Sequence, residues 1–134
     1  MASIFEKLNL KDRQEIVVLH APPSFEPELA RLHVITIHHQ LESVANAGFW
    51  LAFVTRKSEV DTLAPQIAVR AKGDAVVWFA YPKGTSKNYA CDFNRDTGWG
   101  AIKALRFDTV RAVAIDEDWT ALRFRRVEFI KPRN

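Results

Sequence analysis

Short apolar runs separated by polar turns recur along the chain, and they predict strands that are buried on both faces. Four such runs occupy residues 15–20 (EIVVLH), 34–38 (VITIH), 49–55 (FWLAFVT) and 75–81 (AVVWFAY). Apolar residues on both faces are typical of parallel strands, because helices cover both sides of a parallel sheet. Two further runs, 110–115 and 119–128, flank three acidic residues and predict an antiparallel hairpin.

Helical spacing of apolar residues appears between these runs. It predicts helices over residues 24–32 and 59–71, a third that starts after Asn94 or Asp96 and runs through Leu105, and a short helix or apolar lead-in over 4–10. We expect Ser24 to cap the first of these helices, and Ser58 with Asp61 to cap the second. Pro65 is expected to kink or divide the second helix, and Gly73 to follow its end.

The order of these elements defines the fold class. Strands that alternate with helices and then close in a hairpin predict an α/β protein, a three-layer sandwich with a mostly parallel Rossmann-like sheet and a C-terminal antiparallel hairpin. No repeat, low-complexity segment or linker interrupts residues 1–134, so we expect a single domain.

This order of elements resembles an abbreviated Rossmann-like methyltransferase. Residues 16–19 stand in the place of the first strand and residues 76–81 in that of the fifth, and a terminal hairpin follows. In that superfamily the first strand runs into a glycine-rich cofactor loop, whereas this sequence has His20-Ala21-Pro22-Pro23-Ser24-Phe25 there. His38, His39 and Gln40 stand where an acid is expected after the second strand. The resemblance implies the fold, and we predict no bound cofactor.

A second resemblance rests on motifs in the C-terminal half. These are Tyr81-Pro82-Lys83, Arg95-Asp96 followed by Gly98-Trp99, and Val113-Ala114-Ile115-Asp116 with Trp119 and Leu122-Arg123-Phe124-Arg125. Over residues 78–125 the chain is similar to a family of small bacterial proteins that is catalogued only as a domain of unknown function. This resemblance implies no activity.

Composition restricts the kinds of site and the cellular compartment that we expect for the protein. The net charge of +3 is small, and the single cysteine, Cys91, excludes an internal disulfide and a cysteine-based zinc site. Neither a signal peptide nor the ~20 apolar residues of a membrane span is present, so we expect a cytoplasmic protein that does not enter a membrane. His38 and His39 are adjacent on a predicted strand and point to opposite faces, so we expect no metal site.

Polar residues follow three of the predicted parallel strands and form the candidate ligand site. In an open parallel sheet, ligands bind beyond the carboxyl ends of the strands. Lysines and hydroxyls beside helix starts suit an anion such as a phosphate or a carboxylate, although a solvated loop rim has the same composition. The candidate ligand residues are Lys83, Thr85, Ser86, Lys87, His20, Ser24 and Arg56.

A second group of residues is expected to form a structural network around the same loop. Its members are Asp92, Arg95, Asp96, Asp116, Trp119 and Arg123. The favoured interpretation is that Arg95 or Arg123 bridges the acids and that Trp119 packs the hairpin turn onto the body. The alternatives left open are acid–base chemistry by the acids and a stacking surface on Trp119.

These residues lead to three expectations about function. The first is a non-enzymatic domain that binds a small anionic ligand or a protein partner at the carboxyl edge of the sheet. The second is an enzyme that acts on an anionic substrate, with Lys83 as an electrostatic clamp and Asp92 or Asp96 as acid–base. Nucleic-acid binding through the C-terminal basic strand is disfavoured, because the charge excess is small. A homodimer through an exposed edge strand is a further prediction.

Overall fold

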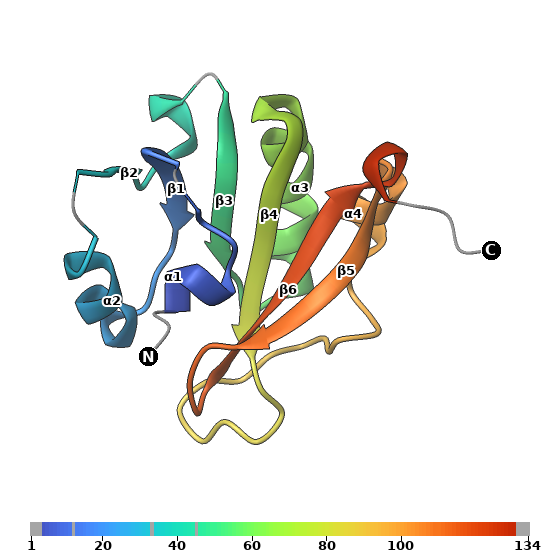
Figure 1. Cartoon of the computed structure of the whole chain (residues 1–134). Helices are drawn as coiled ribbons and strands as arrows, with labels where there is room; N and C mark the ends of the chain where they lie inside the picture. The colour runs from blue at the N-terminus through green and yellow to red at the C-terminus, as the bar shows by residue number, and fades with distance from the viewer. Residues whose placement is uncertain (1–3, 12, 33, 45, 131–134) are drawn as a thin grey trace.

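A six-stranded sheet forms the middle of the molecule (Figure 1). The computed structural model describes residues 4–11, 13–32, 34–44 and 46–130. The strands are β1 (Glu15–Leu19), β2 (Thr36–His38), β3 (Ala47–Phe53), β4 (Ala71–Pro82), β5 (Phe107–Ala114) and β6 (Trp119–Arg126). The helices are α1 (Ile4–Lys7), α2 (Glu26–Ala30), α3 (Lys57–Arg70) and α4 (Gly100–Ala104), with 3-10 turns at η1 (Pro23–Phe25), η2 (Leu41–Ser43) and η3 (Val127–Phe129).

The strands lie in the order β2-β1-β3-β4-β6-β5. Strands β2, β1, β3 and β4 run parallel to one another, whereas β6 is antiparallel to both of its neighbours, β4 and β5. The prediction of a mostly parallel α/β sheet closed by a C-terminal antiparallel hairpin is therefore confirmed. The last strand, β6, lies between β4 and β5, so the two strands that precede it in the chain do not pair with each other.

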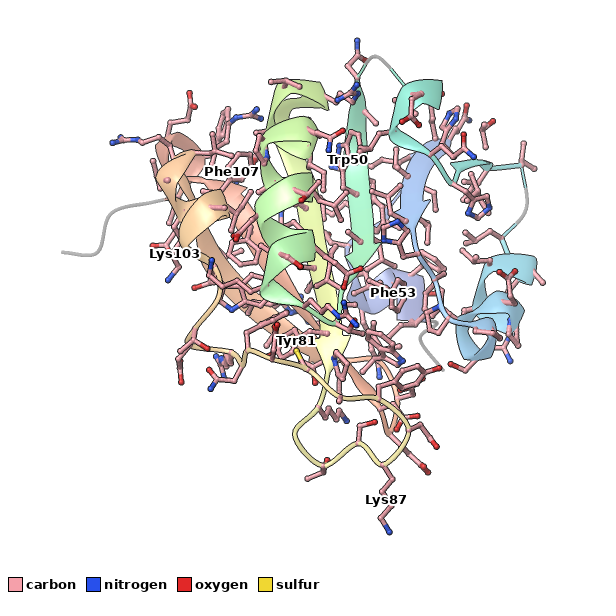
Figure 2. The ribbon with its side chains drawn as sticks, turned by 180° about the vertical axis from the view of Figure 1, so that it is seen from behind. Trp50, Phe53, Tyr81, Lys87, Lys103 and Phe107 are labelled. Carbon is pink, nitrogen blue, oxygen red and sulfur yellow. The ribbon has the colours of Figure 1, made fainter. Side chains whose placement is uncertain are left out.

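Helices cover both faces of the sheet. Successive side chains of each strand point to opposite faces, so the apolar strands present apolar side chains on both sides. On one face, Trp50 of β3 belongs to a buried cluster that includes Ile67 of α3. On the opposite face, the adjacent Phe49 belongs to a cluster that includes Phe5 of α1 and Leu29 of α2. Figures 1 and 2, drawn from opposite sides, show α1 in front of the sheet and α3 and α4 behind it.

Helix α3 differs from its predicted form at its start. It begins at Lys57 because Glu59 supplies the cap: its Oε1 accepts hydrogen bonds from the backbone N–H groups of Thr55 and Arg56, at 2.8 and 3.0 Å. A carboxylate in the first turn satisfies N–H groups that have no partner within the helix, so Ser58 is not needed there. Pro65 does not divide the helix, which runs unbroken to Arg70.

Two other expected helix caps differ as well. Ser24 makes no capping hydrogen bond, because Pro22 and Pro23 lead the chain into the 3-10 turn η1 before α2. Helix α4 begins only at Gly100, and the Asn94 side chain instead accepts a hydrogen bond from the backbone N–H of Asp96 at 2.8 Å. No helix within the described residues is long and apolar enough to cross a membrane.

Gly73 does not end α3 as expected but lies inside β4. Strand β4 starts at Ala71, directly after the helix, and Gly73 adopts a left-handed φ of 55°. The pairing of β3 with β4 shifts register at this level, between Ala47 and Phe49. Because glycine adopts a left-handed φ without steric cost, the residue permits an irregularity in the strand at this point.

Candidate functional site

The segment that joins β4 to α4, residues 83–99, forms one wall of the candidate site. Asp118, in the turn between β5 and β6, fastens this segment. Its carbonyl accepts a hydrogen bond from the Lys83 backbone N–H at 2.7 Å, and its carboxylate accepts from Ser86 Oγ at 2.8 Å and from Asn88 Nδ2 at 3.1 Å. The hairpin turn therefore holds the first half of the segment in place.

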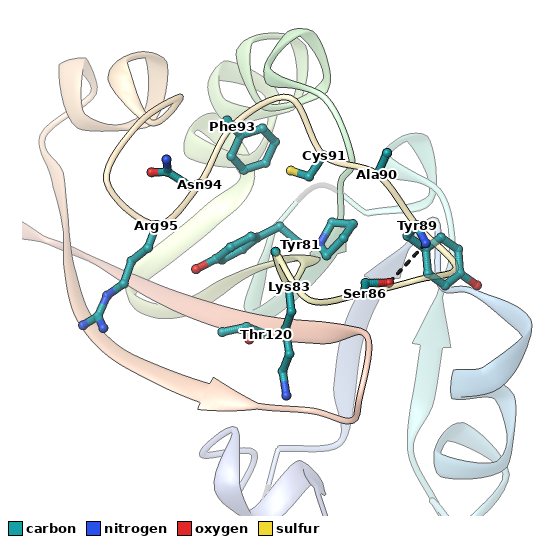
Figure 3. Close-up of a pocket in the computed structure, with 12 residues that line it drawn as sticks. Tyr81, Lys83, Ser86, Tyr89, Ala90, Cys91, Phe93, Asn94, Arg95 and Thr120 are labelled. Carbon is teal, nitrogen blue, oxygen red and sulfur yellow. Dashed lines mark hydrogen bonds between the residues drawn. The ribbon is translucent and has the colours of Figure 1, made fainter.

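Beneath this segment lies a hollow of about 560 Å³, which we call the groove (Figure 3). Lys83 and Arg95 supply two cations from opposite ends of the segment, and the described lining contains no acidic side chain. Figure 3 shows Tyr81, from the end of β4, between Arg95 and Lys83. The lining residues are Tyr81, Pro82, Lys83, Gly84, Ser86, Tyr89, Ala90, Cys91, Phe93, Asn94, Arg95 and Thr120.

Trp99 supports the second half of the same segment. Its ring is 2% exposed and packs edge-on against Tyr81 and Phe93, at centroid distances of 5.6 and 5.0 Å. Its Nε1 donates hydrogen bonds to the backbone carbonyls of Asn94, at 3.1 Å, and Arg95, at 3.0 Å. This buried ring thus fixes the backbone that carries Arg95 to the groove.

Gly98 allows the chain to pass close to the ring of Phe93. Its φ is 89°, and a Cβ built on it would lie 2.7 Å from Phe93 Cβ and 2.9 Å from Phe93 Cγ. Both the positive φ and this close approach require glycine.

A second hollow, of about 440 Å³, adjoins the groove along residues 89–91, which line both. Thr55, Arg56 and Asp92 also line it. Asp92 Oδ1 accepts a hydrogen bond of 2.7 Å from the backbone N–H of Lys57, the first residue of α3. A carboxylate at a helix N-terminus is stabilised by the helix dipole. Asp92 therefore caps the N-terminus of α3 and also presents a charge to this hollow.

Two titratable groups in the groove are held in their neutral forms. Burial, ahead of any neighbouring charge, raises the pKa of the Tyr81 phenol above 10.0. Burial also raises the pKa of the Cys91 thiol above 9.0. At neutral pH, Tyr81 is therefore a hydrogen-bond donor, and Cys91 is a thiol rather than a nucleophilic thiolate.

The structure distributes the predicted ligand residues over three hollows, of which the first two adjoin, and the surface. Lys83 and Ser86 line the groove, and Arg56 lines the second hollow. His20 lies in a third, smaller hollow of about 220 Å³ beside the start of α3. The exposed residues Thr85, Lys87 and Ser24 lie outside these three hollows, and Figure 2 shows Lys87 pointing into solvent at the far end of the molecule.

Two acids of the expected network, Asp92 and Asp116, accept hydrogen bonds from the backbone rather than from arginines. Asp116 Oδ1 accepts from the N–H groups of Asp118, at 2.8 Å, and Trp119, at 2.9 Å, and so closes the hairpin turn. Within the described residues, no hydrogen bond or ion pair joins Arg95 or Arg123 to Asp92, Asp96 or Asp116. Trp119 is 3% exposed and packs between the rings of Phe53 and Tyr89.

The basic residues of the C-terminal strand do not share one face. Arg123 and Arg125 lie on one side of β6, whereas Arg126 stacks over the ring of Phe107 at 4.9 Å and donates hydrogen bonds to two backbone carbonyls. Residues 131–134 lie outside the described part of the chain. This split does not support nucleic-acid binding along the strand.

Sequence reasoning missed several groove residues, notably Tyr81, Asn94 and Thr120, and the anchor Asp118. Tyr81 closes an apolar strand, so its hydroxyl could have been recognised as a polar group at the carboxyl edge. Thr120 comes from a different strand, and no local pattern indicates that it meets the loop. The anchoring role of Asp118 depends on contacts with residues 30 and 32 positions away.

Comparison with known proteins identifies the class of fold. No family model matches the chain, so the resemblance to the uncharacterised bacterial family is not confirmed, and no curated protein matches it. Solved structures do match, and they include methyltransferases, which confirms the predicted Rossmann-like methyltransferase fold. N-methyltransferase NodS from Bradyrhizobium japonicum has a TM-score of 0.53 at 12% identity, and the match covers 92% of each chain.

Two further neighbours are longer than this chain. A fibrillarin pre-rRNA processing protein from Methanococcus jannaschii has a TM-score of 0.56 at 11% identity, over 87% of this chain and 67% of that one. Phospholethanolamine N-methyltransferase 2 from Haemonchus contortus, in complex with phosphomonomethylethanolamine and S-adenosylhomocysteine, has a TM-score of 0.54 at 9% identity. That match covers 98% of this chain but only 39% of the enzyme, so the chain spans well under half of its length.

These neighbours correct the first expectation about function. A non-enzymatic binding domain was expected, whereas several solved structures that are similar to this chain are methyltransferases. The comparison therefore favours the alternative expectation of an enzyme over a non-enzymatic domain.

Proposed function

We propose that this chain is an enzyme of methyltransferase fold that acts on a small anionic substrate bound in the groove. The observation that carries the proposal is the presence of Lys83 and Arg95 in one hollow that has no acidic side chain in its described lining. Two cations at the carboxyl edge of an α/β sheet favour a phosphate or a carboxylate. The Haemonchus enzyme, which shares the fold, is in complex with phosphomonomethylethanolamine, a molecule that carries a phosphate group.

Neutral side chains of the groove would orient the bound substrate. The Tyr81 phenol stays protonated because burial raises its pKa, so it donates a hydrogen bond to a substrate oxygen. Thr120 and Asn94 add a hydroxyl and an amide to the same lining. Cys91 contributes an uncharged thiol, which makes a covalent thiolate mechanism unfavourable at neutral pH.

Asp92 is the favoured acid–base residue. One of its oxygens, Oδ1, accepts the Lys57 N–H, while no hydrogen bond from the described residues engages Oδ2. The second hollow, which Asp92 lines, adjoins the groove along residues 89–91. A substrate that extends from Lys83 across this boundary brings a proton within reach of Oδ2. Asp96 lines another hollow, whose described lining shares the single residue Arg95 with the groove, so it is the weaker candidate.

The residues at the carboxyl ends of β1 and β2 do not fit a cofactor such as the S-adenosylhomocysteine of the Haemonchus enzyme. His20, at a left-handed φ of 59°, begins the turn after β1, and this turn contains no glycine, while the side chains of Pro22 and Phe25 are buried. At the end of β2, His38 Nε2 is occupied by Glu15 at 3.0 Å. The proposed chemistry therefore uses the side chains of this chain alone.

Thermal unfolding in the presence of small phosphates, carboxylates and S-adenosylhomocysteine tests the binding step. We expect at least one anion to raise the melting temperature, and we expect Lys83→Ala to abolish the shift, because the Lys83 charge is removed from the groove. Lys87→Ala is the matched control, since it removes the same charge from the solvent-exposed part of the same segment. An equal shift of the melting temperature in wild type and Lys83→Ala contradicts the proposed site. Stabilisation by S-adenosylhomocysteine contradicts the conclusion that the residues after β1 and β2 do not fit this cofactor.

Turnover of the stabilising anion tests the enzyme itself. Nuclear magnetic resonance of that compound should show chemical conversion by the wild type. Asp92→Asn should still bind the compound but lose conversion, because the amide oxygen retains the acceptor for the Lys57 N–H while its basicity is lost. Binding without conversion by the wild type would refute the enzymatic proposal.

A further inference from the structure

Four arginines lie on the open face of the sheet, and none of them lines the groove. Arg123 of β6 is directly opposite Arg111 of β5, and Arg125 follows two positions later on the same side of its strand. Arg13, from the segment before β1, is close enough for its charge to act on Arg123, and its Nη1 donates hydrogen bonds to the backbone carbonyls of Asn9, at 3.1 Å, and Leu10, at 3.2 Å. We call these four residues the arginine cluster. In Figure 1, no helix of the described chain lies in front of β5 and β6.

One acid, Asp74, partly neutralises the arginine cluster. The Arg125 guanidinium donates a hydrogen bond to each carboxylate oxygen of Asp74, from Nε to Oδ1 at 2.8 Å and from Nη2 to Oδ2 at 2.6 Å. Asp108, which is paired in register with Arg125, accepts a hydrogen bond from its neighbour's N–H and lies 4.0 Å from Lys103. The acids of this region are therefore already engaged, and the remaining arginines have no carboxylate among the described residues.

Arg123 is the cluster member with an unmet hydrogen-bonding requirement. Its Nε is buried and has no acceptor within the described part of the chain. Burial, followed by the charges of Arg125, Arg13 and Arg111, lowers the pKa of the Arg123 guanidinium, and Asp74 offsets only part of this effect. A buried donor without an acceptor, beside several like charges, is unfavourable in the free protein. An anion beside the Arg123 guanidinium would reduce the repulsion between these like charges.

We propose that the arginine cluster binds a phosphate or pyrophosphate group, with Arg123 at its centre and Arg111 and Arg13 around it. Planar guanidinium groups form paired hydrogen bonds to oxyanions, and a multiply charged phosphate neutralises several arginines at once. The site is on the β5–β6 side of the sheet and shares no lining residue with the groove. The proposal therefore does not depend on the enzymatic function of the groove.

Titration calorimetry on the full chain tests this proposal, with pyrophosphate and ADP as separate probes in a low-salt chloride buffer. The measurements use a Lys83→Ala background, so that the groove does not contribute. Two variants, Arg123→Gln and Arg111→Gln, remove cluster members. Arg31→Gln is the control, because Arg31 is 71% exposed and pairs with Glu28 in α2. We expect each cluster variant to weaken binding roughly tenfold or more, and the control to leave it unchanged.

Each outcome of this experiment decides the proposal. Tighter binding of ADP than of pyrophosphate assigns the phosphate to a nucleotide, and the reverse order assigns it to a free polyphosphate. Arg111 is exposed, so its variant carries the test if Arg123→Gln does not give a folded circular dichroism spectrum. No binding in the Lys83→Ala background, or equal binding by the cluster variants and the control, overturns the proposal and leaves the groove function untouched.

Discussion

Replacing Gly98 with alanine tests how the floor of the groove is built. The added Cβ would lie 2.7 Å from Phe93 Cβ and 2.9 Å from Phe93 Cγ, positions close to the backbone that rotation of the ring cannot move away. The residue also has a φ of 89°, outside the range that alanine prefers. The substitution therefore combines backbone strain with a steric clash at one position.

The two effects can be estimated separately. A left-handed conformation costs an L-residue about 1–2 kcal/mol. Inserting a methyl group into a packed site costs about 1–3 kcal/mol more. The lower conformational entropy of the unfolded chain returns about 0.4–1 kcal/mol. The net loss in the free energy of unfolding is about 3 kcal/mol, which for a chain of this length lowers the melting temperature by roughly 12 °C.

Two other glycines separate the strain from the clash. Gly73 has a φ of 55° but no atom within 4 Å of its added Cβ, so Gly73→Ala should cost only about 1 kcal/mol. Gly84 has neither a positive φ nor a neighbour within 4 Å, so Gly84→Ala should change stability by less than about 1 kcal/mol. Urea unfolding of the three variants gives the comparison. If Gly98→Ala lowers the free energy of unfolding no more than Gly73→Ala does, the close approach of Gly98 to Phe93 does not determine the conformation of residues 83–99.

Two further substitutions probe contacts on either side of the sheet. Asp74→Asn should lower the free energy of unfolding by about 0.5–1.5 kcal/mol at neutral pH, a range reduced for solvent screening because the side chains of Arg125 and Asp74 are 33% and 36% exposed. The hydrogen bond from Arg125 holds the pKa of Asp74 below 3.8. The stabilisation by this pair is therefore present above pH 3.8 and is lost as the pH falls below it. Urea unfolding at a series of pH values should show that the variant loses less stability in acid than the wild type. Trp99→Phe should cost about 1–3 kcal/mol, because the carbonyls of Asn94 and Arg95 lose their donor. Hydrogen exchange should then accelerate in residues 92–97, and unchanged exchange there would contradict the role given to Trp99.

The hydrophobic pattern identified the strands well because most of them are buried on both faces. Runs such as 75–81 leave few alternatives to a central parallel strand. The same pattern carries no information about lateral order, so the position of β6 between β4 and β5 did not follow from it. Helix starts were also less certain, since Glu59 and Ser58 compete within one turn and only the folded backbone shows which residue caps α3.

The candidate site was predictable in position but not in detail. Lys83 follows a buried strand, so its place at the carboxyl edge follows from topology. Whether Asp92 or Asp116 meets an arginine or a backbone N–H depends on geometry that no local sequence encodes. The segment after Lys83 contains no regular strand, and its first half is held by Asp118, which lies more than thirty residues further along the chain than Lys83.

The place of β6 between β4 and β5 has a consequence for synthesis on the ribosome. Until residues 119–126 have left the exit tunnel, β4 has an unpaired edge and β5 has no partner in the sheet. An apolar strand with a free edge pairs readily with other chains. The nascent chain therefore passes through an aggregation-prone stage that ends only when its final strand inserts. A premature stop before residue 119 should yield insoluble protein rather than a smaller folded domain.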